Sequence, residues 1–259
     1  MLELIKKAVN QFKGTTGPVR ILTHHDTGGI TSGAIIAKAM QREDRSFRIS
    51  VLKQVDRELI NTLKSEQNDV VFFLDFGSSV LDDLAEINSK VIILDNHEIS
   101  GVVQPNTLLV NPHAREDKEK INASAMSFLF AKELNPANSD LGVLSVLGMV
   151  GDYGDLSNLG PTAQKLISSC EDVVIKQSIM LFPATRPIHK ALEFSSKVYI
   201  PGVTGSSEGV LNLLNEAKIP LKVEGEYRTL LDLAPEETRK LVDLISSRTA
   251  DSEAIRNAF

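Results

Sequence analysis

Apolar residues fall into two kinds of run that alternate over the first 111 residues of the chain. Five short runs rich in valine, isoleucine, leucine and phenylalanine have the composition of buried strands; they span residues 19–24, 47–53, 69–75, 90–95 and 106–111. Between them, apolar residues recur every three or four positions, as in amphipathic helices, over residues 32–40, 57–66 and 80–88. This alternation predicts an α/β domain with a five-stranded parallel sheet flanked by helices.

Helical patterns dominate the remainder of the chain. They cover residues 1–14, 123–134, 140–150, 160–168, 206–217 and 235–246. Pro235 opens the last of these, with Glu236 and Glu237 in its first turn, as is typical of a helix start. We therefore predict a first domain at residues 1–155 and a smaller, mostly helical region at residues 156–259.

Composition narrows the range of functions. The net charge is -6, from 28 lysines and arginines against 34 aspartates and glutamates, so no global basic field attracts nucleic acid. Cys170 is the single cysteine, which rules out an internal disulfide and fits a reducing compartment. The sequence has no transmembrane run and no signal-peptide pattern. We expect a cytoplasmic protein that does not enter a membrane.

Polar residues follow four of the predicted strands. Ligands of open parallel sheets bind beyond the carboxyl ends of the strands, and four of the five histidines lie at three such ends. The residues concerned are His24, His25 and Asp26; Asp75; Asp95, Asn96 and His97; His113 and Arg115; and, after a helical segment, Asp152 and Asp155. Imidazole and carboxylate together suit Mn²⁺, Mg²⁺ or Zn²⁺. The pattern therefore predicts a present or former metal site around one cleft.

Each of these residues taken singly also has a structural interpretation. Asp75 or Asp152 could cap a following helix, and His24 or His97 could be hydrogen-bonded at the edge of the core. Residues 201–209, PGVTGSSEG, resemble a phosphate-binding loop but lack the Walker lysine. A capped helix start is the better interpretation of that stretch.

Four motifs in order, THHDTGGITSG, LDFGSS, LDNHE and GMVGDYGDL, resemble the DHH phosphoesterase superfamily. Within it, they are most similar to the archaeal relatives of the RecJ exonuclease and of Cdc45. The resemblance covers about residues 18–155, and residues 200–217 resemble the region that follows this domain in archaeal RecJ relatives. It implies the same five-stranded sheet that the apolar pattern predicts. No glycine-rich GGGH-like motif occurs, so we expect the superfamily's C-terminal substrate-binding domain to be absent.

The chain departs from the motifs of this superfamily at two positions. The first motif reads H-x-D-x-D-G and the third reads D-H-H, where this chain has Gly28 and Asn96. The resemblance implies one metal held by His24, Asp26 and Asp75, and a second held by residue 28, Asp75, residue 96 and Asp152. Both losses fall on the second metal. We therefore expect one Mn²⁺ at most.

The same resemblance assigns the catalytic positions to Asp95 and His97, with His97 contacting the scissile phosphate. Because hydrolysis with two metals divides its work between the two ions, we expect these positions to be degenerate and without catalytic function. His113 and Arg115, at the end of the fifth predicted strand, are further candidates for contact with phosphate or nucleic acid.

Two functions are compatible with these motifs. The first is a catalytically degenerate, Cdc45-like scaffold of archaeal DNA replication that binds GINS, with MCM helicase as a further partner and weak binding of single-stranded DNA. The alternative is an active, Mn²⁺-dependent, single-strand-specific exonuclease or phosphoesterase. Fold and family alone do not decide between them.

Overall fold

The computed structural model describes residues 1–116, 118–154, 156–170, 173, 181, 183–196 and 198–249. The chain forms two compact units, Met1–Val173 and Val174–Phe259. The division predicted after residue 155 falls earlier than this boundary. Helix α6 (Pro161–Ser168) belongs to the first unit because its Ala163 and Leu166 are buried in the core of that unit.

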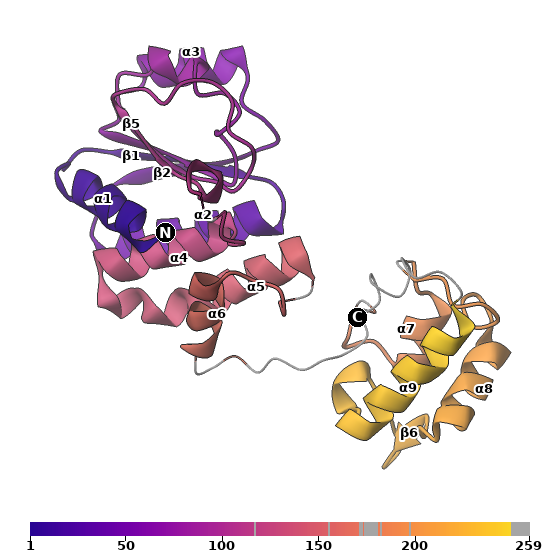
Figure 1. The fold of residues 1–259 in the computed structure, drawn as a ribbon. Coiled ribbons are helices and arrows are strands. Elements are labelled where there is room, and N and C mark those ends of the chain that lie inside the picture. The colour runs from indigo at the N-terminus through magenta and orange to yellow at the C-terminus, as the bar shows by residue number, and fades with distance from the viewer. Residues whose placement is uncertain are drawn as a thin grey trace. The chain divides into compact units, whose positions relative to one another are not determined.

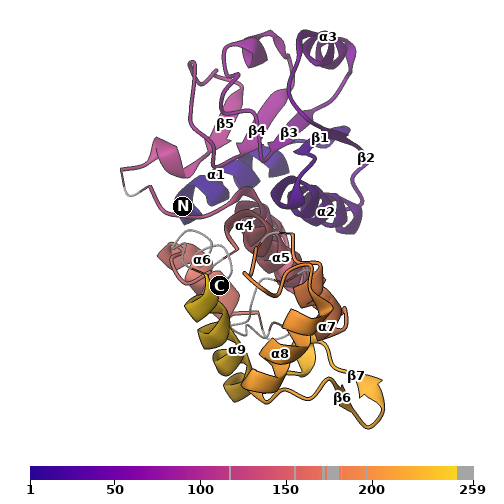
Figure 2. The same ribbon diagram turned by 90° about the vertical axis from the view of Figure 1, so that its right-hand side faces the viewer.

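A five-stranded sheet organises the first unit (Figure 2), as the apolar pattern predicted. Its strands are β1 (Val19–His24), β2 (Phe47–Leu52), β3 (Val70–Leu74), β4 (Lys90–Leu94) and β5 (Thr107–Val110). They lie in the order β2-β1-β3-β4-β5, and every neighbouring pair is parallel. Val19 pairs with Phe47 on one side and with Val70 on the other. The carboxyl ends of the strands therefore reach the same edge.

Helices cover both faces of this sheet (Figure 1). On one face lie α1 (Leu2–Lys13), α2 (Thr27–Arg42) and α4 (Ala123–Leu134), with α5 (Gly142–Tyr153) packed against α2 and α4. On the other face lie α3 (Arg57–Ser65) and the 3₁₀ turn η1 (Asp83–Glu86). Successive residues of a strand serve opposite faces: Phe72 packs in the core below α1 and α4, and Phe73 in the core below α3. Two further 3₁₀ turns are η2 (Pro112–Ala114) and η3 (Pro136–Leu141).

The helix predicted at residues 80–88 is wrong, because this segment forms only the short 3₁₀ turn η1. Its buried apolar residues are Leu81, Leu84 and Ile87, all at most 2% exposed. They recur strictly every third position, which matches the three residues per turn of a 3₁₀ helix. A spacing of three is also compatible with an α-helix, so the sequence pattern alone does not separate the two kinds of helix.

The second unit is mostly helical, as predicted. It contains α7 (Ile188–Glu193), α8 (Ser207–Ala217), α9 (Pro235–Arg248), the 3₁₀ turn η4 (Leu230–Asp232) and a hairpin of β6 (Lys222–Val223) and β7 (Glu226–Tyr227). Its core includes Leu213 of α8 and Leu241 of α9. The side chain of Ser206 caps α8 by accepting a hydrogen bond from the Gly209 backbone N at 3.0 Å. The stretch at 201–209 thus leads into a capped helix start.

Among the described residues, none of the helices combines the length and the hydropathy that crossing a bilayer requires.

Candidate metal centre

The carboxyl ends of β1 and β3 bring three candidate metal ligands together. His24 is the last residue of β1, and Asp26 is the N-cap of α2, where its Oδ1 accepts a hydrogen bond from the Gly29 N at 2.9 Å. Asp75 directly follows β3 and has a left-handed backbone conformation, with φ of 66°. A left-handed aspartate is uncommon and costs backbone energy. The chain leaves β3 in a conformation that places this carboxylate beside Asp26.

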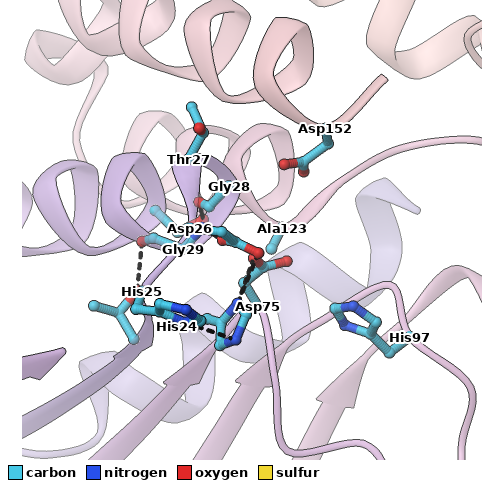
Figure 3. Close-up of polar contacts among 12 residues, drawn as sticks. His24, His25, Asp26, Thr27, Gly28, Gly29, Asp75, His97, Ala123 and Asp152 are labelled. Carbon is cyan, nitrogen blue, oxygen red and sulfur yellow. Dashed lines mark hydrogen bonds and ion pairs between the residues drawn. The ribbon is translucent and has the colours of Figure 1, made fainter. Parts of the chain in front are cut away.

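These three side chains point toward one another (Figure 3). His24 Nδ1 lies 2.7 Å from Asp26 Oδ2 and 3.9 Å from Asp75 Oδ2. One ligand atom from each residue lies within 4.8 Å of the others. An imidazole and two carboxylates at this separation can converge on one divalent cation.

The electrostatics of Asp75 favour a cation at this position. Its side chain is 3% exposed. The pKa of Asp75 is raised to about 9. Burial is the largest cause, and the hydrogen bond with Asp26 and the charges of Asp26, Asp152 and Asp95 act in the same direction. Crowded carboxylates are stabilised in the charged form by a bound cation. The residues of this half of the centre therefore fit a divalent metal.

The other half of the centre lies around residues 28, 96 and 152, the positions that were assigned to a second metal. Protein groups fill it. A Cβ atom at Gly28 would lie 2.6 Å from Asp152 Oδ2, so the Asp152 carboxylate occupies the space of a side chain at residue 28. Asp152 lies in the last turn of α5 and points toward Gly28 (Figure 3). Its carboxylate accepts hydrogen bonds from Asn122 Nδ2 at 2.7 Å and from the Gly28 backbone. Its ligand atoms therefore already have protein donors.

Asn96 is also bonded to protein. Its Oδ1 accepts a hydrogen bond from the Ala123 backbone N at 3.1 Å, in the first turn of α4. The N-cap of the same helix is Asn122, which donates to Asp152. Groups at the N-termini of α2 and α4 thus donate hydrogen bonds to Asp152 and Asn96. A hydrogen-bonded amide and a missing side chain do not fit a second metal.

Asp95 and His97 form a separate, well-defined pair. Asp95 is fully buried and accepts hydrogen bonds from the Ser78 N at 3.0 Å and from His97 Nδ1 at 2.7 Å. Burial by itself would raise the pKa of Asp95, but the hydrogen bonds from His97 and Ser78 lower it overall. The hydrogen bond to Asp95 raises the pKa of His97. His97 remains 58% exposed in its side chain and stands apart from His24 in Figure 3.

Asp75 connects this pair to the first cluster. One ligand atom from each of Asp75, Asp95 and His97 lies within 4.8 Å of the others. Asp75 is therefore shared by two groups of candidate ligands. Asp152 lies beside these groups, because its charge helps to raise the pKa of Asp75. The residues predicted to converge at this edge therefore belong to one of the two groups or lie beside them; they are His24, Asp26, Asp75, Asp95, His97 and Asp152.

The end of β5 is tied to the same edge. Asn111 donates from Nδ2 to Ser78 Oγ at 2.8 Å and to the His97 carbonyl at 2.9 Å, and its Oδ1 accepts from the His113 N at 2.7 Å. His113 lies in η2 with its side chain exposed, and Arg115 follows as the C-terminal cap of that turn. Asp155, the remaining candidate, lies outside the described residues.

Sequence reasoning missed the residues that hold these ligands. Asn122 directly precedes the helix predicted at residues 123–134, so its role as an N-cap could have been predicted. Its second bond, to Asp152 across 30 positions of the chain, has no signal in the local pattern. Asn111 ends the fifth strand, but nothing in its neighbours indicates that it also bonds Ser78.

Two family models match the chain. "DHH family, N-terminal domain" matches residues 18–150, and "DHH-CID domain" matches residues 182–257. The chain is also 28% identical to MJ0831 of Methanocaldococcus jannaschii over 272 residues, which cover all of this chain and 62% of that protein. The chain thus spans less than two thirds of the curated relative it matches.

Solved structures share the fold at low sequence identity. Cdc45 from Entamoeba histolytica has a TM-score of 0.62 at 15% identity, over 95% of this chain and 55% of that one. RecJ from Thermus thermophilus, in complex with Mn²⁺, has a TM-score of 0.55 at 20% identity, over 95% of this chain and 38% of that one. Another exonuclease RecJ bound to manganese has a TM-score of 0.54 at 18% identity, over 94% of this chain and 66% of that one.

Proposed function

This chain belongs to the DHH family, and from that membership we propose that it is a catalytically degenerate, Cdc45-like member that acts as a scaffold. Its main partner is the GINS complex of the archaeal DNA replication machinery, with MCM helicase as a second partner. The observation that carries the proposal is the filled second half of the metal centre. Asp152 occupies the side-chain space of Gly28, and Asn96 is bonded to α4.

The proposal leaves one metal position. His24, Asp26 and Asp75 would hold a single Mn²⁺, because they combine the required ligand types within 4.8 Å. When bound, the ion supplies Lewis-acid chemistry and charge neutralisation. In this chain the second effect dominates, because the ion offsets the carboxylates that crowd around Asp75. Its role is then to stabilise the edge of the sheet.

The edge strand β2 is the docking surface we assign to GINS. It lies at the end of the strand order, where its outer backbone groups are available to another chain. Three of its apolar side chains are exposed: Phe47 by 36%, Ile49 by 41% and Val51 by 54%. They occupy alternate positions and so share one face of the strand. Native proteins seldom leave such an edge uncovered, so this stripe fits a protein partner.

Co-purification tests the scaffold function directly. The full chain carrying an affinity tag is mixed with purified archaeal GINS complex at moderate salt, with and without EDTA. We expect GINS to be retained in both conditions, since the interface does not involve the metal position. We also expect the variant Ile49→Lys to lose GINS, because a charge is placed in the apolar stripe.

Lys38→Glu is a matched control, since Lys38 is an exposed residue of α2 whose ammonium donates to Gln41 of the same helix. It should retain GINS as the wild type does. Failure of the wild-type chain to retain GINS, or loss of binding on chelation, would contradict the scaffold function.

A second candidate function is an active, Mn²⁺-dependent single-strand exonuclease or phosphoesterase. The observation that favours it is the sharing of Asp75 by the group with His24 and Asp26 and the group with Asp95 and His97. Labelled single-stranded DNA and RNA, incubated with the chain and Mn²⁺, decide between the two functions. We expect no cleavage above that of the Asp26→Asn variant. Strong cleavage by the wild type alone would replace the scaffold by the enzyme.

A further inference from the structure

A groove on the first unit is lined by residues of α1, α4 and α6, and its described lining includes no residue of β2 and no candidate metal ligand. These three helices lie on the same side of the sheet (Figure 1). The volume of the groove is about 570 Å³, in the range of sites that hold ligands or anchoring side chains. Buried side chains form its floor: Ile5 is 1% exposed, Phe128 2% and Leu166 4%. Leu2 lines the groove while 49% exposed. The groove is thus an open, mainly apolar depression between helices.

Further apolar side chains widen this surface. Leu129 of α4 also lines the groove, as do Pro136 and Pro161. Contiguous apolar surface on a protein commonly marks an interaction site. Residues of all three helices line the groove, so an apolar element seated in it would contact α1, α4 and α6 together. An amphipathic helix is the element that fills grooves of this kind.

The positive charges around the groove favour an acidic partner. Each of the three helices contributes one exposed lysine to the lining, namely Lys6, Lys132 and Lys165. Among the described lining residues, Glu133 is the single acidic side chain. This local excess of positive charge contrasts with the net charge of -6 of the whole chain. It is therefore a property of the groove rather than of the surface in general.

The lysines are placed to contact both the apolar face and the acidic flanks of an amphipathic helix. The Lys132 ammonium lies 5.7 Å from the centroid of the Phe128 ring, so its stem covers part of the apolar floor. Lys6 forms an exposed ion pair with Glu3 at 3.2 Å, which a partner carboxylate can replace at little cost. Ammonium groups at the rim would meet the flanks of a helix whose apolar side faces the floor.

We propose that this groove binds an amphipathic helix of another protein, apolar on one face and acidic along its flanks. The apolar residues of that helix would follow a spacing of three and four, to reach the floor from successive turns. Complementary charge at the rim speeds association and excludes basic helices. The inference does not rest on the scaffold function, because it uses α1, α4 and α6 and not β2.

The test uses two fluorescein-labelled 14-residue peptides as probes. Both have leucine at positions spaced by three and four; one has glutamate at the remaining positions, and the other has lysine. Fluorescence anisotropy measures their binding to the full chain. We expect the glutamate peptide to bind at least about tenfold more tightly than the lysine peptide, a preference that decreases with salt.

Two variants locate the binding. Lys132→Glu/Lys165→Glu should weaken binding of the glutamate peptide by about tenfold and strengthen binding of the lysine peptide. Leu2→Asp should weaken both, and its fold should persist because Leu2 is half-exposed. Lys38→Glu makes the same change of charge at one residue outside the groove. It should leave binding of the glutamate peptide unchanged.

Three outcomes would overturn the proposal. The first is equal binding of both peptides, or binding that the lysine reversals do not change. The second is uptake of one dodecanoate per chain by wild type while the glutamate peptide does not bind, which would identify a fatty-acid site. The third is a dimer in sedimentation that dissociates on Lys165→Glu, which would make the groove a contact between copies.

Discussion

Gly28 is the residue at which a side chain would meet a neighbouring carboxylate. Asp152 occupies its side-chain space, since a Cβ atom added to Gly28 would lie 2.6 Å from Asp152 Oδ2. Alanine in place of glycine in a helix normally raises stability by about 0.5–1 kcal/mol. Here we expect Gly28→Ala to lower the free energy of unfolding by about 1–3 kcal/mol, because the Asp152 carboxylate must move away from its donors.

Urea denaturation of the wild type and Gly28→Ala measures this loss, and Asp152→Ala supplies the control background. In that background the alanine at residue 28 meets no carboxylate, so its cost should disappear. An equal cost in both backgrounds would show that Asp152 is not the obstacle.

Asp26 is the residue at which a metal ligand and a helix cap coincide. Asn is as good an N-cap as Asp, so Asp26→Asn keeps the cap of α2 and removes the charge. We expect one Mn²⁺ per chain in the wild type by calorimetry. Asp26→Asn should weaken that binding by more than about tenfold. Asp152→Asn should change it little, because Asp152 belongs to the filled half of the centre.

The Mn²⁺ affinity should also fall as the pH is lowered below about 9. The reason is that burial and the neighbouring carboxylates raise the pKa of Asp75 to about 9, and Asp75 must lose its proton to bind the metal. Two tight, equivalent sites in the wild type, or an affinity that does not change between about pH 8 and about pH 5, would contradict this assignment.

At the scale of elements, the start of α9 depends on one ion pair. Glu237 accepts hydrogen bonds from Arg228 Nη1 at 2.7 Å and from the Ala234 N at 2.8 Å. The bond from Arg228 lowers the pKa of Glu237 to about 2, against the opposing effect of burial. Because the folded pKa is below the unfolded one, the stabilisation is complete above about pH 4.5 and is lost as the pH falls toward 2.

Glu237→Gln tests this dependence. We expect it to lower the free energy of unfolding by about 1 kcal/mol at pH 7, and by progressively less below about pH 4.5. Chemical denaturation of the full chain, followed by circular dichroism at several pH values, gives the difference. Glu236→Gln, one position earlier and exposed, is the matched control and should show no such pH dependence. A difference that stays constant to low pH would refute the ion-pair explanation.

Strands could be predicted from the sequence with most certainty where all their residues are buried. Strand β3 is a continuous apolar run whose residues are all buried, and a run of this kind can be recognised without tertiary information. The structure of the segment at 80–88 was not predictable, because spacing by three fits both an α-helix and a 3₁₀ turn. The convergence of His24, Asp75 and Asp95 was predictable from strand ends. The hydrogen bond between Asp152 and Asn122 was not predictable, since it joins two residues 30 positions apart.

At the scale of the whole molecule, the net charge limits binding of nucleic acid. A chain with a net charge of -6 has no overall positive field that would attract the phosphates of a nucleic acid. We expect a dissociation constant for an oligo-dT strand between about 10⁻⁴ and 10⁻⁶ M at physiological salt, weakening steeply as salt rises. Fluorescence anisotropy from about 50 to 200 mM salt measures it. Nanomolar affinity that salt leaves unchanged would point to a dedicated stacking platform instead.

The hydrogen bonds of Asp152 and Asn96 have a consequence for directed evolution of this fold. A selection for nuclease activity would gain nothing from Asp at residue 28 alone, since that side chain collides with Asp152. Histidine at residue 96 alone removes the acceptor of the Ala123 N–H. We therefore expect either single substitution to lower stability unless the contact between Asn122 and Asp152 is loosened as well. The order in which such substitutions are introduced should then decide which of them are tolerated.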